Sequence, residues 1–499
     1  MGWPWSLPAC ATLGTDLRTK DYKRTFQHLG KAKDLGKARV LVLAILVLVL
    51  SVGTSFGEVI LAGEDVQATL DKARPGDTVL VKPGQYEPFT VDKELVVKGA
   101  GATLICAQLQ TPAITIWADN VAVSGFVVKG FPESSEAKFS YYMDTSVKKP
   151  NYRLNLPNSA ILVAGNDVVI EDTLVSGAEV GVLAESASNV TLRNDTIQYC
   201  KTGLELLLCT GGHIESCNFI GCEKYGAYLE RSDEILLDNN EVLDTSNAGV
   251  LLKESSRCVV EDNHFSGNRE GLFLWNSSSN EVRRNEANRN TYYGMVISEH
   301  SDNNTIVDNQ AKECGGGEFK RFGIGISLQE NSSHNVVARN VVENNLNGLE
   351  LTRGCEFNLI CCNNASENSN GIRLDKNQNN LVYLNNFKRN MVNAYDNASH
   401  NFWNGSVGNY YSDYRGKDCD GDGIGDNPYW IPKGSSCSVD WKPLMKSTSE
   451  ELDLVKAKED ISLYANYVPE EHLPYGAKYS KEGNQVIVIG GRAPTMWWL

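Results

Sequence analysis

One four-residue pattern, glycine-apolar-any-apolar, recurs every 22 or 23 residues between Asn189 and Asp302: Gly203-Leu204-Glu205-Leu206, Gly226-Ala227-Tyr228-Leu229, Gly249-Val250-Leu251-Leu252, Gly271-Leu272-Phe273-Leu274 and Gly294-Met295-Val296-Ile297. After an interruption the pattern resumes at Gly325, Gly348 and Gly371. A fixed period of this length is typical of solenoids, in which each repeat packs only against its neighbours.

The spacing within the pattern decides which solenoid is expected. Its apolar positions are two residues apart, which is the spacing of a β-strand. The repeat lacks the i, i+3, i+4 spacing of a helix, which argues against ankyrin, tetratricopeptide and leucine-rich repeats. Two further series suit sharp corners, since Asn tolerates left-handed backbone and bonds its neighbours. These series are Asn240, Asn263, Asn285, Asn309, Asn340, Asn363 and Asn386, and Cys200, Cys222, Asn268, Asn290, Cys314, Asn345, Asn368 and Asn390. Together they predict an all-β, right-handed parallel β-helix with turns about 4.8 Å apart.

The segments outside the repeats have other compositions. Asp65–Ala73 reads as a short amphipathic helix that would cap the open end of a coil spanning residues 58–445. Residues 1–57 form a leader in which the apolar run 40–50 follows Lys and Arg and precedes small residues, as in a signal peptide. An uncleaved anchor is the alternative, although the run is shorter than the ~20 residues of a membrane span. No chemistry is visible in the tail, residues 446–499.

Charge and cysteine usage narrow the class. The net charge of −15 disfavours nucleic acid, whose phosphates would be repelled. Because the leader resembles a signal peptide, we expect an extracytoplasmic protein (periplasmic, secreted or at the cell surface). Any attachment to a membrane would be through the N-terminal segment only. Export would permit disulfides among the 13 cysteines. Cys200, Cys209, Cys217 and Cys222 lie on adjacent turns and could pair, or they could be small core residues.

Two insertions interrupt the period at the same corner, just before the glycine strand. They span residues 131–159 and 315–322, and carry Tyr141, Tyr142 and Tyr152 in the first and Lys320 and Arg321 in the second. Long loops on a rigid scaffold tend to carry function, so these two would bound a groove along the coil. Tolerated decoration is the alternative.

Between the insertions, aromatic residues fall at outward positions of the strands. Tyr228 and Phe273 occupy the outward slot after the glycine, and Trp275 lies two residues beyond Phe273. Exposed aromatic rings on a flat parallel sheet suit stacking on the apolar faces of sugars. They could equally pack against the long insertion.

An acidic loop at 418–426 resembles the first part of an EF-hand calcium loop. Carboxylates stand at positions 1, 3, 5 and 9, a glycine stands at position 6, and a backbone carbonyl is expected at position 7: Asp418, Asp420, Asp422, Asp426, Gly423 and Ile424. Alternate carboxylates of this kind converge on one hard cation. Calcium is therefore predicted, with an acidic turn without metal as the alternative.

The second half of that loop departs from the EF-hand pattern. Position 12 is Tyr429 and not Glu, so the bidentate ligand would come from elsewhere, and Asp440 is a candidate. Cys419 and Cys437 flank this region and could close a disulfide around it.

These residues carry a family resemblance that covers roughly Glu58 to Met445. The segment from Pro75-Gly76-Asp77-Thr78 to Tyr86, the repeats, and Gly408-Asn409-Tyr410-Tyr411-Ser412-Asp413-Tyr414 with the loop after it are similar to the NosD-type β-helix family. That family overlaps the carbohydrate-binding and sugar-hydrolase (CASH) repeats and has the single-stranded pectin-lyase-like fold. Its name implies a periplasmic copper-binding accessory protein for nitrous oxide reductase maturation, working with an ABC transporter. Many relatives resemble archaeal surface proteins instead.

The residues themselves give copper little support. Copper(I) prefers Cys and Met, and copper(II) prefers His. The repeat region has His213, His264, His300, His334 and His400 on separate turns, and Met295 points into the core.

Catalysis on glycosides needs two carboxylates about 5–10 Å apart. Glu254, Glu299 and Glu330 share one outward slot five residues after the glycine and are the catalytic candidates, although solvated carboxylates without a role fit the same pattern. The sequence therefore predicts binding of a polysaccharide or surface glycan along one face. The alternatives are a copper-delivery accessory protein, and a polysaccharide lyase, hydrolase or epimerase.

Overall fold

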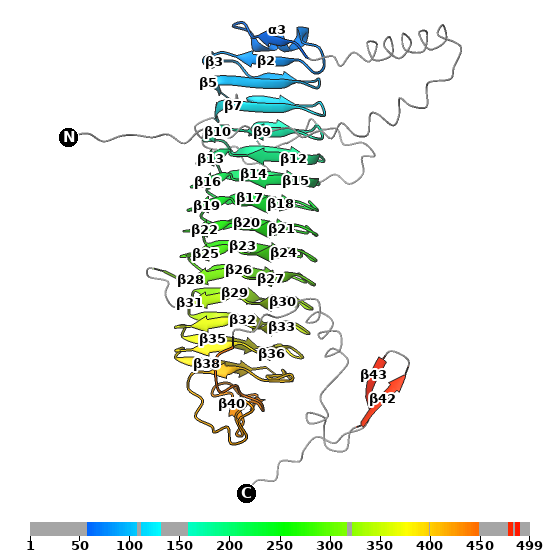
Figure 1. The fold of residues 1–499 in the computed structure, drawn as a ribbon. Coiled ribbons are helices and arrows are strands. Elements are labelled where there is room, and N and C mark those ends of the chain that lie inside the picture. The colour runs from blue at the N-terminus through cyan, green and yellow to red at the C-terminus, as the bar shows by residue number, and fades with distance from the viewer. Residues whose placement is uncertain are drawn as a thin grey trace, which may run out of the picture. The chain divides into compact units, whose positions relative to one another are not determined.

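The chain winds into a coil of stacked turns. The structure, a computed structural model, describes residues 57–106, 111–130, 158–316, 322–398 and 400–448, and the backbone of 478–482 and 485–489. Each turn contains three strands joined by corners, as in β14 (Thr202–Leu207), β15 (Thr210–Glu215) and β16 (Asn218–Ile220). The next turn repeats this order and pairs with it in parallel (Figure 1). The predicted parallel β-helix is confirmed.

The strands form three ladders along the coil. Among the described residues, the first strands of the turns form a 13-stranded parallel sheet, called sheet B: β4 (Phe89–Val91), β6 (Ile114–Ile116), β8 (Ser159–Val163), β11 (Val180–Glu185), β14, β17 (Tyr225–Glu230), β20 (Ala248–Lys253), β23 (Glu270–Trp275), β26 (Tyr293–Ser298), β29 (Ile324–Leu328), β32 (Asn347–Thr352), β35 (Asn370–Asp375) and β38 (Val392–Asn397).

The second and third strands of the turns form a larger sheet, called sheet A. Its first ladder holds β1 (Val59–Leu61), β2 (Thr78–Val81), β5 (Val96–Cys106), β7 (Ala122–Lys129), β9 (Val169–Glu171), β12 (Ser188–Arg193), β15, β18 (Leu236–Asp238), β21 (Val259–Glu261), β24 (Glu281–Arg283), β27 (Thr305–Val307), β30 (Val336–Ala338), β33 (Leu359–Cys361) and β36 (Leu381–Tyr383). Its second ladder adds β3 (Gly84–Tyr86), β10 (Leu174–Ser176), β13 (Thr196–Gln198), β16, β19 (Glu241–Leu243), β22 (His264–Ser266), β25 (Glu286–Asn288), β28 (Gln310–Lys312), β31 (Val341–Glu343), β34 (Asn364–Ser366), β37 (Asn386–Lys388) and β39 (Tyr410–Tyr411).

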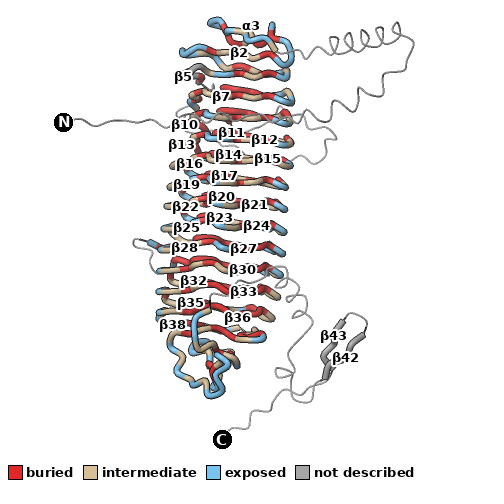
Figure 2. Tube along the Cα trace, viewed as in Figure 1, coloured by how far each residue is buried: buried red, intermediate tan, exposed pale blue. Residues whose placement is uncertain are grey.

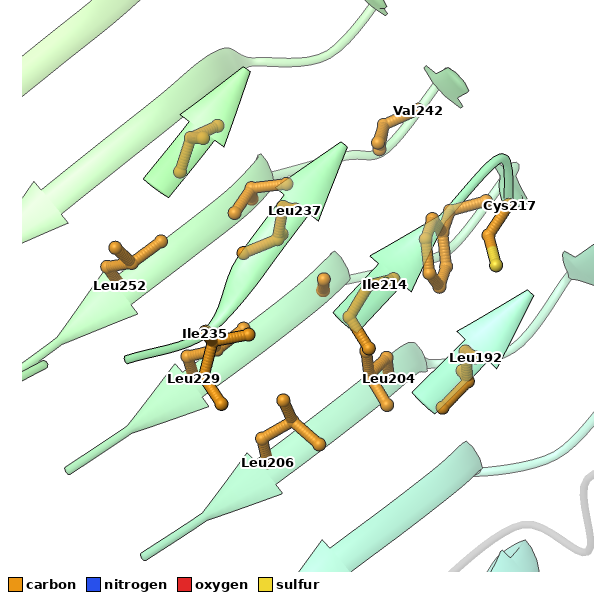
Figure 3. Packing of buried hydrophobic residues seen from close by; sticks show 14 of the residues in the cluster. Leu192, Leu204, Leu206, Ile214, Cys217, Leu229, Ile235, Leu237, Val242 and Leu252 are labelled. Carbon is orange, nitrogen blue, oxygen red and sulfur yellow. The ribbon is translucent and has the colours of Figure 1, made fainter. Parts of the chain in front are cut away.

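The apolar positions of the repeat line the inside of the coil. Leu204 and Leu206 are at most 1% exposed and lie beside Leu229, Leu252 and their counterparts from sheet A (Figure 3). Figure 2 shows buried residues along the strands of successive turns and exposed residues at the corners. One continuous core therefore holds the turns together.

The recurring glycine is required by the close approach of the next turn. A Cβ on Gly203 would lie 2.4 Å from the carbonyl oxygen of Gly226, which is nearer than any side chain tolerates. The pairing register passes over this position, with Thr202 opposite Tyr225 and Leu204 opposite Ala227. As a result, the residues immediately before and after the glycine are each aligned with their counterparts in the next turn.

The predicted Asn series forms a buried hydrogen-bond ladder. The Oδ1 of Asn263 accepts the backbone N–H of Asn240 at 2.9 Å, and its Nδ2 donates to the carbonyl of Leu237 at 2.9 Å and to Oδ1 of Asn285 at 3.0 Å. Each amide thus satisfies a corner N–H of the turn before it, which would otherwise be buried without a partner.

Two details of the Asn prediction are corrected. The ladder passes through Asn385, which continues it to Asn409, and not through the neighbouring Asn386. The left-handed backbone belongs to the residue before each ladder Asn, for example Asp262 (φ 54°), and not to the Asn itself. The Asn is placed by its side-chain bonds.

Both ends of the coil are covered. The predicted capping helix forms as α3 (Val66–Lys72); the Asp65 side chain accepts the N–H of Ala68 at 2.9 Å, and Leu70 is buried. Lys93 donates to the last carbonyls of this helix, including that of Asp71 at 2.7 Å. At the other end β40 (Tyr429–Trp430) and β41 (Val439–Asp440) form a small antiparallel pair.

The core cysteines are small buried residues. The nine coil cysteines whose side chains are described are free and buried, including the four for which pairing was considered: Cys200, Cys209, Cys217 and Cys222. Several of these thiols donate to backbone carbonyls, as Cys217 Sγ does to the carbonyl of Glu215 at 3.3 Å.

The leader and most of the tail lie outside the described residues. Residues 478–489 contain the antiparallel hairpin β42 (Lys478–Glu482) and β43 (Gln485–Ile489). Of the helices in the described ranges, none has the length and apolar character needed to cross a membrane.

Removing one ladder amide should destabilise the coil. We predict that Asn263→Ala lowers the free energy of unfolding by about 2–3 kcal/mol, because the buried N–H of Asn240 loses its acceptor. Chemical denaturation followed by circular dichroism measures this. Glu241→Ala, at an exposed strand position, is the control and should change stability by no more than about 0.5 kcal/mol. Equal effects of both variants would contradict a structural role for the ladder.

Asp195 occupies the ladder position filled by Asn further along. It is 1% exposed, accepts the N–H of Thr173 at 2.8 Å, and its second oxygen is buried without a hydrogen-bond donor among the described residues. Burial raises its pKa to about 7. Because this exceeds the value of about 3.9 in an unfolded chain, the stability that Asp195 contributes is present at low pH and is lost as pH rises to 7.

We therefore predict that Asp195→Asn is more stable than the wild type at pH 8, by up to about 4 kcal/mol. The gain should shrink toward zero near pH 4, since Asn does not titrate. Unfolding curves at several pH values test this, and a difference independent of pH would argue against a buried charge at this position.

Candidate functional site

The outward face of sheet B carries two aligned columns of side chains. One column contains the residue before each glycine, such as Tyr225, and the other contains the residue two after it, such as Tyr228. The rings of these two tyrosines stack with centroids 5.2 Å apart. Both rings are partly exposed, whereas Gly226 and Ala227, the residues between them in the sequence, are buried. The two rings therefore lie outside the core. This face therefore displays side chains at a fixed turn-to-turn spacing.

A connected network, here called the aromatic network, crosses three turns of this face. The hydroxyl of Tyr228 donates to Glu230 Oε2 at 2.6 Å, and Lys253 Nζ donates to Glu230 Oε1 at 2.8 Å. The same ammonium lies 5.3 Å from the ring centre of Trp275, which is 39% exposed. With Tyr225 it presents rings, a carboxylate and an ammonium side by side.

The charges of the aromatic network are set by these contacts. Burial raises the pKa of Tyr228, and the hydrogen bond to Glu230 raises it further, so its hydroxyl stays protonated. Burial alone would raise the pKa of Glu230, but hydrogen bonds from Lys253 and Tyr228 bring it below its usual range. Glu230 is therefore an ionised carboxylate held between two donors.

Further along the same face lies a second group, here called the carboxylate group. Glu350 is 8% exposed and accepts hydrogen bonds from Asn347 Nδ2 at 2.7 Å and Ser327 Oγ at 3.3 Å. Glu270 is 6% exposed, and its Oε2 has no hydrogen-bond partner among the described residues. Burial raises the pKa of both carboxyls. The pKa of Tyr293 is also raised, by its own burial and by the negative charges of Glu350 and Glu270.

Sequence reasoning identified only part of this face. It found Tyr228, Phe273 and Trp275, but not Tyr225, Glu270, Tyr293 or Glu350. Its outward slot began after the glycine, whereas the register shows that the residue before the glycine also faces outward. A polar residue immediately before the glycine is the signal that could have located Glu270.

The predicted catalytic carboxylates lie elsewhere, at the corner that follows sheet B. Glu254, Glu299 and Glu330 all have left-handed backbone there, with φ values of 51°, 57° and 47°. Glu254 pairs with Arg231 at 2.7 Å, and Glu330 pairs with Arg353. Glu254 and Glu299 lie two turns apart along the coil, a distance of about 10 Å. Glu254 and Glu330 are thus ion-paired corner residues, and all three carboxylates remain predictions without further support.

The two insertions that were predicted to bound a groove fall mostly outside the described residues. Tyr141, Tyr142, Tyr152, Lys320 and Arg321 lie outside the described residues. Of the predicted ligand-binding residues, Tyr228, Phe273 and Trp275 are described, and all three lie on the outward face of sheet B.

The acidic loop brings part of its predicted ligand set together. Carboxylate oxygens of Asp418, Asp420 and Asp422 lie within 4.8 Å of one another. Asp426 instead accepts the N–H of Cys419 at 2.9 Å, and the N–H of Ile424 donates to Asp422 at 2.7 Å. Three converging carboxylates suit a hard cation such as calcium, which remains a prediction here.

Two neighbours of that loop differ from expectation. Asp440 is fully buried, and its oxygens accept the N–H groups of Asn409 at 2.7 Å and Lys442 at 3.0 Å, so it ends the Asn ladder and is not the missing ligand. Burial raises its pKa to about 7. Cys419 and Cys437 are both free and exposed, so the predicted disulfide is not formed.

A second set of possible metal ligands lies on sheet A. His213, Glu215 and Asp238 each offer one ligand atom, and these atoms lie within 4.8 Å of one another. The other histidines of the coil form no comparable group with Cys, Asp or Glu in the described ranges.

These features define a parallel β-helix protein with a polar, aromatic face along sheet B. The chain belongs to the NosD family, described as periplasmic copper-binding protein, whose match covers residues 137–313 and 260–416. Together these stretches span 137–416, more than half of the 499 residues. The family description agrees with the expected extracytoplasmic location. No curated protein matches the chain.

Three solved structures illustrate the similarity of the coil to known folds. They are the A-module of the mannuronan C-5 epimerase AlgE6 of Azotobacter vinelandii (14% identity, TM-score 0.47, covering 71% of this chain and 97% of that one), the Dettilon tailspike protein (13%, 0.49, 60% and 62%) and DFA-IIIase of Arthrobacter chlorophenolicus A6 without its lid (18%, 0.46, 60% and 86%). At this level of similarity they carry no argument about ligand or activity.

Copper fits some donors of this chain better than others. The core thiols are poor ligands, because burial raises the pKa of Cys217 to about 12 and so keeps its sulfur protonated. His213 with Glu215 and Asp238 supplies an imidazole and two carboxylates, a donor set that suits copper(II) and not copper(I).

We predict that calcium raises the melting temperature of the protein and that Asp420→Asn abolishes the shift. Binding would relieve the repulsion among the three carboxylates, and without the bidentate Glu of an EF-hand it should be weak. Differential scanning calorimetry in the presence and absence of millimolar calcium measures the effect. Magnesium and Glu286→Gln are the matched controls, and a shift retained in Asp420→Asn would contradict the site.

Proposed function

We propose that this protein binds a neutral polysaccharide or surface glycan along the outward face of sheet B. The observation that carries the proposal is the aromatic network: Tyr225, Tyr228 and Trp275 offer ring faces, with Glu230 and Lys253 between them. Sugar rings stack on aromatic faces through their apolar C–H surfaces, while their hydroxyls need charged or polar partners nearby.

The parallel register supports an extended ligand. Outward side chains recur once per turn, about 4.8 Å apart, so a linear chain lying along the coil would meet a similar row of groups over several turns. The net charge of −15, with Glu205, Glu270 and Glu350 on the same face, disfavours a polyanionic glycan. A neutral chain is the better match.

The test begins with a glycan array probed with the full-length chain, followed by calorimetric titration of the strongest ligand. Trp275→Ala should weaken binding about tenfold, since it removes one stacking platform worth about 1–1.5 kcal/mol. Trp430→Ala is the matched control, because Trp430 is also exposed but lies in β40 at the end of the coil. Binding unchanged in Trp275→Ala, or no binding by the wild type, would refute the proposal.

Catalysis on the bound glycan is the second candidate, and the carboxylate group favours it. Burial raises the pKa of the Glu350 carboxyl, the direction that a general acid requires, and Arg373 lies 4.0 Å from it. Release of sugar fragments that Glu350→Gln abolishes and Glu241→Gln, at an exposed position of sheet A, leaves intact would establish this activity. Intact glycan after prolonged incubation would exclude it for that ligand.

A further inference from the structure

The outward face of sheet A holds one place where an imidazole and two carboxylates converge. His213 and Glu215 are two residues apart on β15, so both side chains leave the same face of the strand, and Ile214 between them points into the core. Asp238 on β18 is the direct register partner of Glu215. The strand pairing itself therefore brings the three side chains together.

We infer that His213, Glu215 and Asp238 bind one divalent transition-metal ion, with copper(II) preferred. The three ligand atoms lie within 4.8 Å of one another. Ligands about 2.0–2.2 Å from a shared ion are roughly 3.4 Å apart at a tetrahedral angle and at most about 4.2 Å apart. Small side-chain rotations, without movement of the strands, would close this set around an ion.

The imidazole has an atom that lacks a partner. Nε2 of His213 is buried without a hydrogen bond among the described residues, and it lies 3.8 Å from the carboxylate of Asp238. That distance is too long for a hydrogen bond but suits two ligands of one ion. On the other side of the ring, Nδ1 lies 3.9 Å from Glu215.

The surrounding charges favour a cation. Glu261, the register partner of Asp238 in the next turn, adds a further carboxylate beside the group, and Arg283 and Arg284 pair with it on its other side. Arg193 donates to Glu215 at 3.1 Å and competes for that carboxylate. It also lies 3.7 Å from Glu171, so it would keep an acidic partner if Glu215 turned toward the ion.

The donor set selects the class of ion. One imidazole nitrogen with two carboxylate oxygens favours the later first-row divalent ions, and copper(II) leads their affinity order. Without a thiolate or thioether in the set, copper(I) is disfavoured. The acidic loop, by contrast, offers oxygen donors alone and suits harder ions. The chain would thus hold two chemically distinct metal sites, and the sheet A site stands independently of glycan binding.

The test uses the full-length chain, stripped of metal and kept in excess calcium so that the acidic loop does not compete. Copper(II) sulfate is titrated by calorimetry, and the product is examined by electron paramagnetic resonance. We expect one copper(II) per chain with hyperfine splitting from nitrogen. His213→Ala should weaken binding about 100-fold and remove that splitting. Asp238→Asn and Glu215→Gln, which preserve side-chain shape, should each weaken it about tenfold or more.

His264→Ala is the matched control. His264 also faces a glutamate, with Nδ1 3.5 Å from Glu286, but no third ligand from the described part of the chain joins them. This variant should keep wild-type affinity and spectrum. Three results would overturn the inference: no stoichiometric copper(II) on the wild type, unchanged binding in His213→Ala, or equal loss in the His213 and His264 variants. Circular dichroism of each variant confirms that the coil is intact.

Discussion

Backbone N–H groups at the corners of the coil are the groups that the rest of the structure must satisfy. A strand residue bonds to the turns on either side, but a chain that bends sharply after every few residues turns some N–H groups away from that pattern. At the buried corners these groups would lack water and a partner. Here the side chain of the corresponding residue one turn further on accepts them, as Asn263 does for Asn240.

That constraint explains why the choice of residue is restricted at the inward positions of the repeat and unrestricted at the outward positions. Ladder positions need a short side chain with an acceptor, and glycine positions need an absent one, because the neighbouring backbone leaves no space. Outward strand positions carry neither restriction. Aromatic rings, carboxylates, arginines and a histidine can all occupy them without disturbing the stack, and chemistry can be assembled there by choosing residues in adjacent turns.

The outward faces of sheet B and sheet A both carry such groups. On sheet B, Tyr228, Glu230 and Lys253 come from two turns and meet through direct hydrogen bonds. On sheet A, His213 and Asp238 come from two strands and are placed by register alone. In both cases the distance between partners is set by the spacing of parallel strands, so no special loop is needed to build the group.

The coil, its period, its inward residues and its capping helix could all be predicted from the residues, because a solenoid repeats the same local requirement many times and each repetition is visible. The sequence also located Tyr228, Phe273 and Trp275 on an outward slot. The register across the glycine, and with it the outward positions of Tyr225 and Glu270, became known only from the folded coil. The same is true of Asp440, which ends the ladder, and of His213 beside Asp238. Residues 23 or more positions apart become neighbours only when the pairing of the turns is known, and one residue of register separates a core side chain from an exposed one.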